Sequence, residues 1–255
     1  MTLNKTILIT GASAGIGLAT AESFAKLGWS LVLGARRLEN LEKSKKNLLE
    51  LGAQKVLVLP LDVTNETSVN VFTKKALEFS AHGIDVLFNN AGLALGVDKL
   101  ADTNILESSV VMETNVMGLL RVTRAILPSM ISKKSGHIIN MGSIAGFLVY
   151  EGGGVYCASK HAVRALTKTL RLELNGTPIR VTSIDPGMVE TEFSEVRLKS
   201  TERAKAVYQG ITPLSAHDIA ECVTWSALRP THVNIDEIVV MPVDQAAPHK
   251  VNRVK

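Results

Sequence analysis

Short runs of apolar, often β-branched residues alternate with longer segments of helical periodicity, and this alternation constrains the fold more than any other feature. The apolar runs predict seven strands, at 5–10, 30–35, 55–62, 84–89, 136–143, 179–184 and 237–241. Between the second and third runs, leucines recur at 38, 41, 48, 49 and 51 with charged residues among them, which is a helical period. Strands that alternate with helices form right-handed βαβ crossovers and therefore a parallel sheet.

The remaining segments extend this pattern over the whole chain. They predict helices from the first turn to about 27, then at 38–51, 65–80, 104–130, 155–174 and 215–228, with a kink near Asn115 in the long fourth helix. The strands are nearly all apolar, as burial on both faces requires. We therefore predict an α/β protein: a single doubly wound Rossmann domain over 1–255, with a seven-stranded, mostly parallel sheet and helices on both faces. The segment 188–212 breaks the alternation and is predicted to be a substrate lid, and the polar, basic segment 245–255 a flexible or subunit-bridging tail.

Composition excludes several classes of function. Hydrophobic residues make up 46% and charged residues 20% of the 255 residues, as in globular proteins that bury a sizeable core. The net charge is +4, but the basic residues are scattered and aromatic residues amount to only 4%, so no nucleic-acid partner is predicted.

Membrane and secretory signals are also missing from the sequence. No apolar run reaches the roughly 18 residues of a membrane span, and the first apolar run lacks the flanks of a signal peptide. Cys157 and Cys222 are too few for a disulfide framework, which favours a cytoplasmic protein. No metal site is predicted, because His137, His161, His217 and His232 lack metal-ligand spacing.

A glycine-rich segment, TGASAGIG at 10–17, joins the first predicted strand to the first helix. Glycines let the backbone turn sharply and let a pyrophosphate approach closely, while the helix N-terminus offers free N–H groups and a positive dipole end. The spacing differs from the G-x-G-x-x-G fingerprint, so the segment alone fits either a tight turn or a dinucleotide site.

The end of the second predicted strand bears on which dinucleotide would bind. Enzymes that use NAD usually carry an acid there for the ribose 2′-hydroxyl, whereas this chain has Ala35 followed by Arg36 and Arg37. Guanidinium groups pair with a 2′-phosphate through two hydrogen bonds. The pattern therefore favours NADP, against the alternative of two surface arginines.

A tyrosine and a lysine four residues apart, Tyr156 and Lys160, share one face of a predicted helix. A neighbouring ammonium stabilises phenolate, so we expect Lys160 to lower the pKa of Tyr156 toward the range of a general acid or base. Ser143 ends the fifth predicted strand, at the edge of the sheet where such folds bind ligands. Its hydroxyl can hold a carbonyl oxygen beside Tyr156.

These features, with LDV at 61–63, NNAG at 89–92, Asn115, and Pro186-Gly187 followed by Thr191, resemble the short-chain dehydrogenases/reductases in order and approximate spacing over essentially the whole chain. The resemblance implies an enzyme with catalytic residues Asn115, Ser143, Tyr156 and Lys160, in which Asn115 holds a water that relays protons to Lys160. It implies NADP binding by Gly11, Ser13, Gly15, Ile16, Gly17, Arg36, Arg37, Asp62, Val63, Asn89, Ala91, Gly92, Tyr156, Lys160, Pro186, Gly187, Val189 and Thr191. It also implies a homotetramer.

Within this family, the stretches at 89–96, 136–146, 151–160, 191–199 and 231–245 resemble the branch of NADP-dependent serine and 3-hydroxy acid dehydrogenases, which also oxidise L-allo-threonine. The resemblance implies a small 3-hydroxy acid as substrate, such as serine, L-allo-threonine, 3-hydroxyisobutyrate or 3-hydroxypropionate. The branch tends to have Asn where this chain has Gly154, which leaves room for a different preference.

A 3-hydroxy acid needs a partner for its carboxylate near Ser143 and Tyr156. Two candidates are the backbone N–H groups around Gly153 and Gly154, and the lid residue Arg197; alternatively, Arg197 pairs with Glu192 or Glu195 on the lid surface.

Two other functions stay open from the sequence alone. A 3-oxoacyl carrier-protein reductase, or another carbonyl reductase, could use Arg121 and Arg124 as a docking face. A non-catalytic NADP sensor is disfavoured because the full catalytic set is present.

Overall fold

A seven-stranded parallel sheet forms the centre of the protein in the computed structural model, which describes residues 5–254. Its order is β3-β2-β1-β4-β5-β6-β7, and every neighbouring pair is parallel. The strands are β1 (Thr6–Thr10), β2 (Ser30–Ala35), β3 (Val56–Pro60), β4 (Val86–Asn89), β5 (Gly136–Met141), β6 (Ile179–Pro186) and β7 (Glu237–Val240). The predicted doubly wound α/β fold is confirmed, with each strand within a few residues of its expected place.

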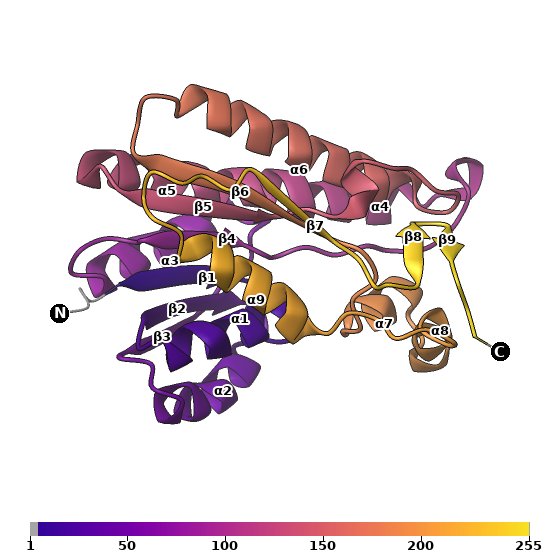
Figure 1. The fold of residues 1–255 in the computed structure, drawn as a ribbon, viewed down its shortest axis with the longest axis horizontal. Helices are drawn as coiled ribbons and strands as arrows, with labels where there is room; N and C mark the ends of the chain where they lie inside the picture. The colour runs from indigo at the N-terminus through magenta and orange to yellow at the C-terminus, as the bar shows by residue number, and fades with distance from the viewer. Residues whose placement is uncertain (1–4, 255) are drawn as a thin grey trace.

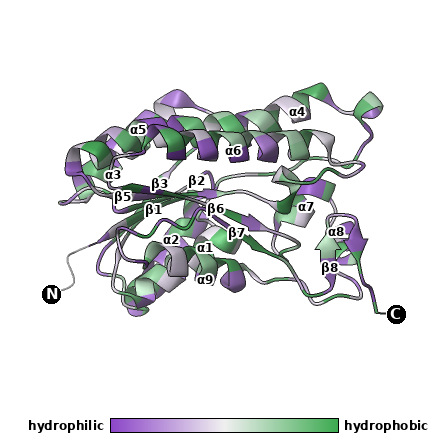
Figure 2. Ribbon diagram, turned by 45° about the horizontal axis from the view of Figure 1, so that its top comes forward, coloured by the Kyte–Doolittle hydropathy of each residue, from purple (hydrophilic) through white to green (hydrophobic). Residues whose placement is uncertain are grey.

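Helices cover both faces of the sheet, as Figures 1 and 2 show. One layer contains α1 (Gly15–Lys26), α2 (Leu38–Glu50) and α9 (Ala216–Ala227). The other contains α3 (Glu66–Phe79), α4 (Ile105–Met112), α5 (Leu119–Lys133) and α6 (Gly154–Glu173). Each face of the sheet has its own hydrophobic core, and alternate residues of β1 contribute to each. Ile7 and Ile9 pack in the core under α1, α2 and α9, whereas Leu8 packs in the core on the opposite face.

The strand order reverses between β1 and β4, which lie side by side in the middle of the sheet although β2 and β3 intervene in sequence. In open α/β sheets, ligands bind at this switch point, outside the carboxyl ends of the strands. The turn after β1, the NNAG segment after β4 and Ser143 after β5 consequently meet at one edge.

The long fourth helix is interrupted where the sequence predicted a kink. A π-helical segment, η2 (Glu113–Gly118), separates α4 from α5 and contains the buried Asn115. Single π-helical turns inside α-helices commonly mark functional sites. The structure thus interrupts the helix with a π-helical turn at the position where the sequence predicted a kink.

The segment 188–212 contains two short helices, α7 (Phe193–Leu198) and α8 (Thr201–Val207), beyond the carboxyl ends of the strands (Figure 1). The chain then forms a hairpin of β8 (Gln245–Ala247) and β9 (Lys250–Val251), which the sequence analysis did not predict. Arg253 donates to the carbonyls of Val207 and Gln209, so the end of the chain is attached to α8. Subunit bridging by 245–255 stays a prediction, and Lys255 itself lies outside the described residues.

Within residues 5–254, no helix has both the length and the apolar character that crossing a bilayer requires.

Candidate active site

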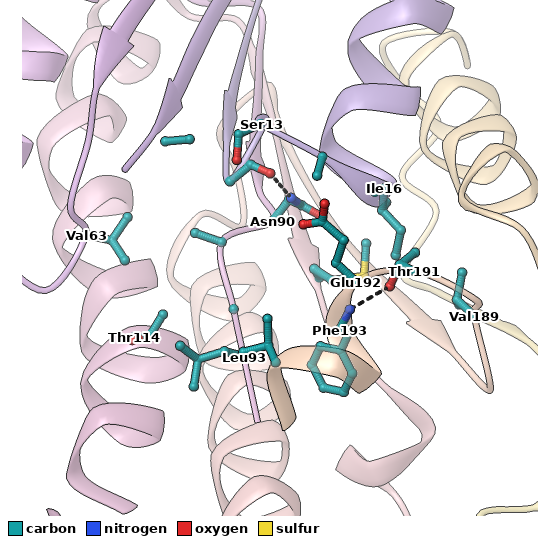
Figure 3. A pocket seen from close by; sticks show the side chains of 18 of the residues that line it. Ser13, Ile16, Val63, Asn90, Leu93, Thr114, Val189, Thr191, Glu192 and Phe193 are labelled. Atoms are coloured by element: carbon teal, nitrogen blue, oxygen red, sulfur yellow. Dashed lines mark hydrogen bonds between the residues drawn. The ribbon is translucent and has the colours of Figure 1, made fainter. Parts of the chain in front are cut away.

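A cavity of about 680 Å³ opens at the carboxyl edge of the sheet, within the size range of cofactor and ligand sites. Figure 3 shows Ser13 and Ile16, from the first turn and helix, near Thr191, Glu192 and Phe193 of the segment 188–212. The predicted site residues in its lining are Gly11, Ser13, Gly15, Ile16, Arg36, Arg37, Asp62, Val63, Ala91, Gly92, Ser143, Tyr156, Lys160, Pro186, Gly187, Val189 and Thr191.

The glycine-rich turn has the shape of a phosphate cradle. Gly11 has a φ of +66°, and a Cβ there would lie 2.9 Å from the Ala91 Cα. The N-cap residue Ala14 provides no side-chain hydrogen bond, so the first N–H groups of α1 face the cavity without a cap. These observations fit a dinucleotide pyrophosphate. Gly17 is outside the lining; a Cβ there would lie 2.5 Å from the Gly11 carbonyl oxygen, so its role is close packing of helix and turn.

Two arginines border the cavity at the end of β2. Arg36 is exposed, and no acid stands at the preceding position, the buried Ala35. Arg37 donates from Nε and Nη2 to the Ser13 hydroxyl, both at 3.3 Å, and its Nη2 lies 2.7 Å from Glu192 Oε2. Sequence reasoning missed this carboxylate, which lies 155 residues away along the chain. Guanidinium groups at this rim fit a ribose 2′-phosphate.

The two asparagines after β4 have different positions. Asn90 lines the cavity and donates to the carbonyls of Thr10 and Gly11, which ties the NNAG segment to the first turn. Asn89 is buried and donates to Thr123 and Asn140 instead. The structure therefore brings Asn90 to the cavity, whereas the sequence analysis chose Asn89.

Tyr156 and Lys160 lie one turn apart on α6, facing Ser143. The Ser143 hydroxyl interacts with the Tyr156 phenol. Lys160 is buried, and its Nζ donates to the Met141 carbonyl at 2.7 Å while lying 5.9 Å from the centre of the Tyr156 ring. Ser143, just after β5, and Tyr156 and Lys160 of α6 thus converge at one wall of the cavity.

The electrostatics of this group differ from the expectation. Burial raises the pKa of Tyr156 above its usual value, and the Ser143 hydroxyl and the Arg197 charge only partly oppose this effect. The expected lowering of the Tyr156 pKa is therefore wrong for this arrangement: burial has the largest effect, and the Lys160 ammonium is not among the groups that shift this pKa. Burial also lowers the pKa of Lys160 itself to about 8, against the opposing charge of Asp185.

Asn115 uses its side-chain amide inside the protein. Its Oδ1 accepts the Leu93 N–H at 2.8 Å, and its Nδ2 donates to the Leu93 carbonyl and to Ser159 Oγ. Both amide hydrogens thus have protein acceptors. A water relay through Asn115 stays a prediction.

Helix α7 places two residues one turn apart against Tyr156. The Phe193 ring lies 5.5 Å from the Tyr156 ring, and the Arg197 guanidinium lies 5.8 Å from its centre. Arg197 donates to the carbonyl of Gly96, the hydroxyl of Tyr150 and the carbonyl of Gly152, at 3.1, 2.9 and 3.1 Å. The alternative that Arg197 pairs with Glu192 or Glu195 is therefore wrong.

Gly153 and Gly154 line a smaller recess of about 30 Å³ that also contacts Tyr156 and Arg197. A Cβ at Gly153 would lie 2.3 Å from the Tyr150 ring, and one at Gly154 would lie 2.5 Å from Leu100 Cδ2. Packing alone thus accounts for the missing side chains. Substrate contact by this segment stays a prediction.

Comparison with known proteins agrees with this geometry. The profile of the short chain dehydrogenase family matches residues 5–202. An NADP-dependent 3-hydroxy acid dehydrogenase from Schizosaccharomyces pombe is 45% identical over 98% of this chain and 96% of its own length. A serine 3-dehydrogenase from Rhizobium radiobacter is 42% identical over 96% of each chain.

Among solved structures, the closed form of a serine dehydrogenase complexed with NADP⁺ superposes with a TM-score of 0.89. It is 38% identical, and the match covers 98% of this chain and 99% of the other. With a matched family profile and relatives of this similarity over nearly their full lengths, the chain belongs to the short-chain dehydrogenase family.

Proposed function

We propose that this protein is an NADP-dependent oxidoreductase for small 3-hydroxy acids. The observation that carries the proposal is that one cavity is lined by the Arg36–Arg37 pair at one end and by Ser143, Tyr156 and Lys160 at the other. Bound NADP would supply or accept the hydride at its nicotinamide, with Arg36 and Arg37 at the 2′-phosphate. Relatives whose names specify this chemistry support the proposal.

The protein's own residues handle the proton and the substrate oxygen. Tyr156 donates its phenolic proton to the oxygen when a carbonyl is reduced and takes it back when an alcohol is oxidised. Its raised pKa keeps the phenol protonated at neutral pH, the state needed for reduction. Ser143 holds the same oxygen by a hydrogen bond, and Lys160 provides a buried ammonium one helical turn from the phenol.

The substrate class follows from the charge of Arg197. All three hydrogen bonds of this guanidinium go to neutral acceptors, and within residues 5–254 it has no carboxylate partner. A guanidinium has five N–H donors, so two remain for a ligand. A carboxylate beside Tyr156 would neutralise this charge, which favours a hydroxy acid over a neutral alcohol.

A substrate panel tests the function. Purified enzyme with NADP⁺ is assayed on serine, allo-threonine, 3-hydroxyisobutyrate, 3-hydroxypropionate and simple alcohols. We expect turnover of hydroxy acids, and we expect Arg197→Lys to raise KM for them about 10-fold or more, since a charge-assisted hydrogen bond contributes about 1.5–3 kcal/mol. Equal effects on acids and neutral alcohols would make Arg197 a lid anchor only. Saturation by an acyl-carrier thioester but not by free hydroxy acids would overturn the substrate class.

The carrier-protein alternative gains no support from the structure. Arg121 lies 2.8 Å from Glu113 and donates to the Val63 carbonyl. One of the two arginines considered for docking a carrier protein is therefore already paired within the protein.

Assembly and location complete the proposal. Apolar side chains are exposed on α4, where Ile105 and Leu106 are 73% and 79% exposed, and Trp225 and Val239 are half-exposed on α9 and β7. Two separate apolar faces suit the two interfaces of a homotetramer. Light scattering of the protein as it elutes from a size-exclusion column tests the tetramer, and a monomer would contradict it.

The free thiols of Cys157 and Cys222 fit a cytoplasmic location.

A further inference from the structure

A carboxyl group lies completely buried behind the active site. Asp185, on β6, is 0% exposed, and it forms no ion pair within 4 Å among the described residues. Its Oδ1 accepts the main-chain N–H of Ser143 at 3.1 Å. Ser183 lies close by, but neither its hydroxyl nor Asp185 Oδ2 makes a hydrogen bond of good geometry. Burial of such a group costs several kcal/mol unless something compensates.

The neighbouring strand is shaped around this carboxyl. A Cβ at Gly142 would lie 1.9 Å from Asp185 Oδ1, so only glycine can occupy the position. The Gly142 N–H donates to the Ile184 carbonyl at 2.8 Å, which fixes the strand end at this close approach. Both Gly142 and Ser143 line the cofactor cavity, whereas Asp185 does not.

Lys160 reaches the same strand end, because its Nζ donates to the carbonyl of Met141 at 2.7 Å and the next residue, Gly142, packs directly against the Asp185 carboxyl. Burial lowers the pKa of Lys160 and raises the pKa of Asp185 to about 6, and each charge opposes the shift of the other. At neutral pH the two groups therefore carry opposite charges. The other charged group acting on Asp185 is Glu237 on β7, which is itself paired with Arg164 and Lys168 of α6.

We propose that Asp185 is a positioning residue for the reaction: it holds the Ser143 main chain and supplies the buried negative charge that stabilises the Lys160 ammonium. It acts through these two residues and touches neither substrate nor cofactor. The inference rests on the proposed function for the roles of Ser143 and Lys160. This role explains why a carboxylate, whose burial costs free energy, stands at a position where the Ser143 N–H needs only one hydrogen-bond acceptor.

The test compares Asp185→Asn with Asp85→Asn. Asparagine at 185 keeps an oxygen for the Ser143 N–H and removes only the charge. Asp85, just before β4 and far from the carboxyl ends of the strands, is a matched control. It also accepts a main-chain N–H, from Thr6 at 2.7 Å, and it also lies close to a lysine, Lys133 at 2.8 Å.

Without the Asp185 charge, the Lys160 ammonium is less stable and loses its proton at lower pH. In Asp185→Asn we expect the alkaline limb of the kcat profile to move to lower pH, with kcat at pH 9 reduced roughly tenfold, the ratio for one pKa unit. NADPH affinity, by fluorescence titration, should stay within about twofold. Asp85→Asn should lower the free energy of unfolding and leave the profile in place. An unchanged profile in Asp185→Asn, or equal shifts in both variants, would overturn the proposal.

A measurement without turnover separates this inference from the proposed function. In ¹³Cε-lysine spectra, the Lys160 titration should move to lower pH in Asp185→Asn even if hydroxy acids prove not to be substrates. Where Asp185→Asn does not fold, Lys160→Met gives the reciprocal test: loss of the ammonium should raise the pKa of the Asp185 carboxyl, read from its ¹³Cγ resonance. An unmoved Asp185 resonance would refute the coupling.

Discussion

Replacing Glu192 with glutamine tests how the cavity recognises its cofactor. Arg37, which is proposed to bind the 2′-phosphate together with Arg36, is already paired with Glu192 at 2.7 Å. A bound 2′-phosphate must displace this carboxylate from Arg37 or lie beside it as a like charge. Glutamine keeps the size of the side chain and removes the competing charge, so NADP should bind more tightly to Glu192→Gln.

The size of the effect follows from the exposure of the pair. The two side chains are 47% and 50% exposed, and ion pairs in such positions contribute about 0.2–1 kcal/mol. Removing the competitor should therefore lower the Kd for NADP by roughly 1.4- to 5-fold. NAD, which has no 2′-phosphate, should bind with nearly unchanged affinity. The gain should shrink at about 1 M salt, where the screening length falls to about 3 Å.

Isothermal titration of wild type, Glu192→Gln and Glu195→Gln with both cofactors provides the measurement. Glu195→Gln is the matched control, because it removes the same charge from an exposed position one turn further along, in the first turn of α7, for which Glu192 is the N-cap residue. Weaker NADP binding in Glu192→Gln, or an equal gain in Glu195→Gln, would refute the idea that Glu192 competes for Arg37.

Three further predictions concern the proton donor, the cofactor rim and the fold. Tyr156→Phe should lower turnover by roughly 10²–10⁴-fold with NADPH binding nearly intact, and steady-state activity within twofold of wild type would remove Tyr156 from the mechanism. Arg36→Ala should weaken NADP binding by about 10- to 100-fold, since a charge-assisted hydrogen bond contributes about 1.5–3 kcal/mol. An equal loss of affinity for NAD in the same titration would contradict the assignment of Arg36 to the 2′-phosphate. Burial holds the pKa of His137 well below 6.5, so the unfolded state takes up a proton first and the free energy of unfolding should decline below pH 6.5, by at most about 1.4 kcal/mol per pH unit. Urea denaturation at pH 7.5 and 5 should show that His137→Gln reduces this decline, and an identical decline would assign it to other groups.

The fold and most of the cavity lining could be predicted from the sequence, for a local reason. Alternation of apolar strands and amphipathic helices specifies a parallel sheet, and parallel strands place their carboxyl ends at one edge. Motifs that follow β1, β4 and β5 must then meet there, as Gly11, Ala91 and Ser143 do. The kink at Asn115 was also visible locally, although the hydrogen bonds that Asn115 makes to Leu93 were not.

Tertiary structure alone decided the contacts that join distant segments. The choice of Asn90 over Asn89 depends on which side chain faces the cavity at a strand end, and composition cannot distinguish two adjacent asparagines. The Arg37–Glu192 pair and the Arg197 contact with Gly96 join residues 155 and 101 positions apart. Asp185 appears in the sequence as one acid before Pro186, and only the packing of β6 against β5 places it behind Ser143. Periodicity reports which face of an element is buried; which side chains then meet depends on how elements from the whole chain pack together.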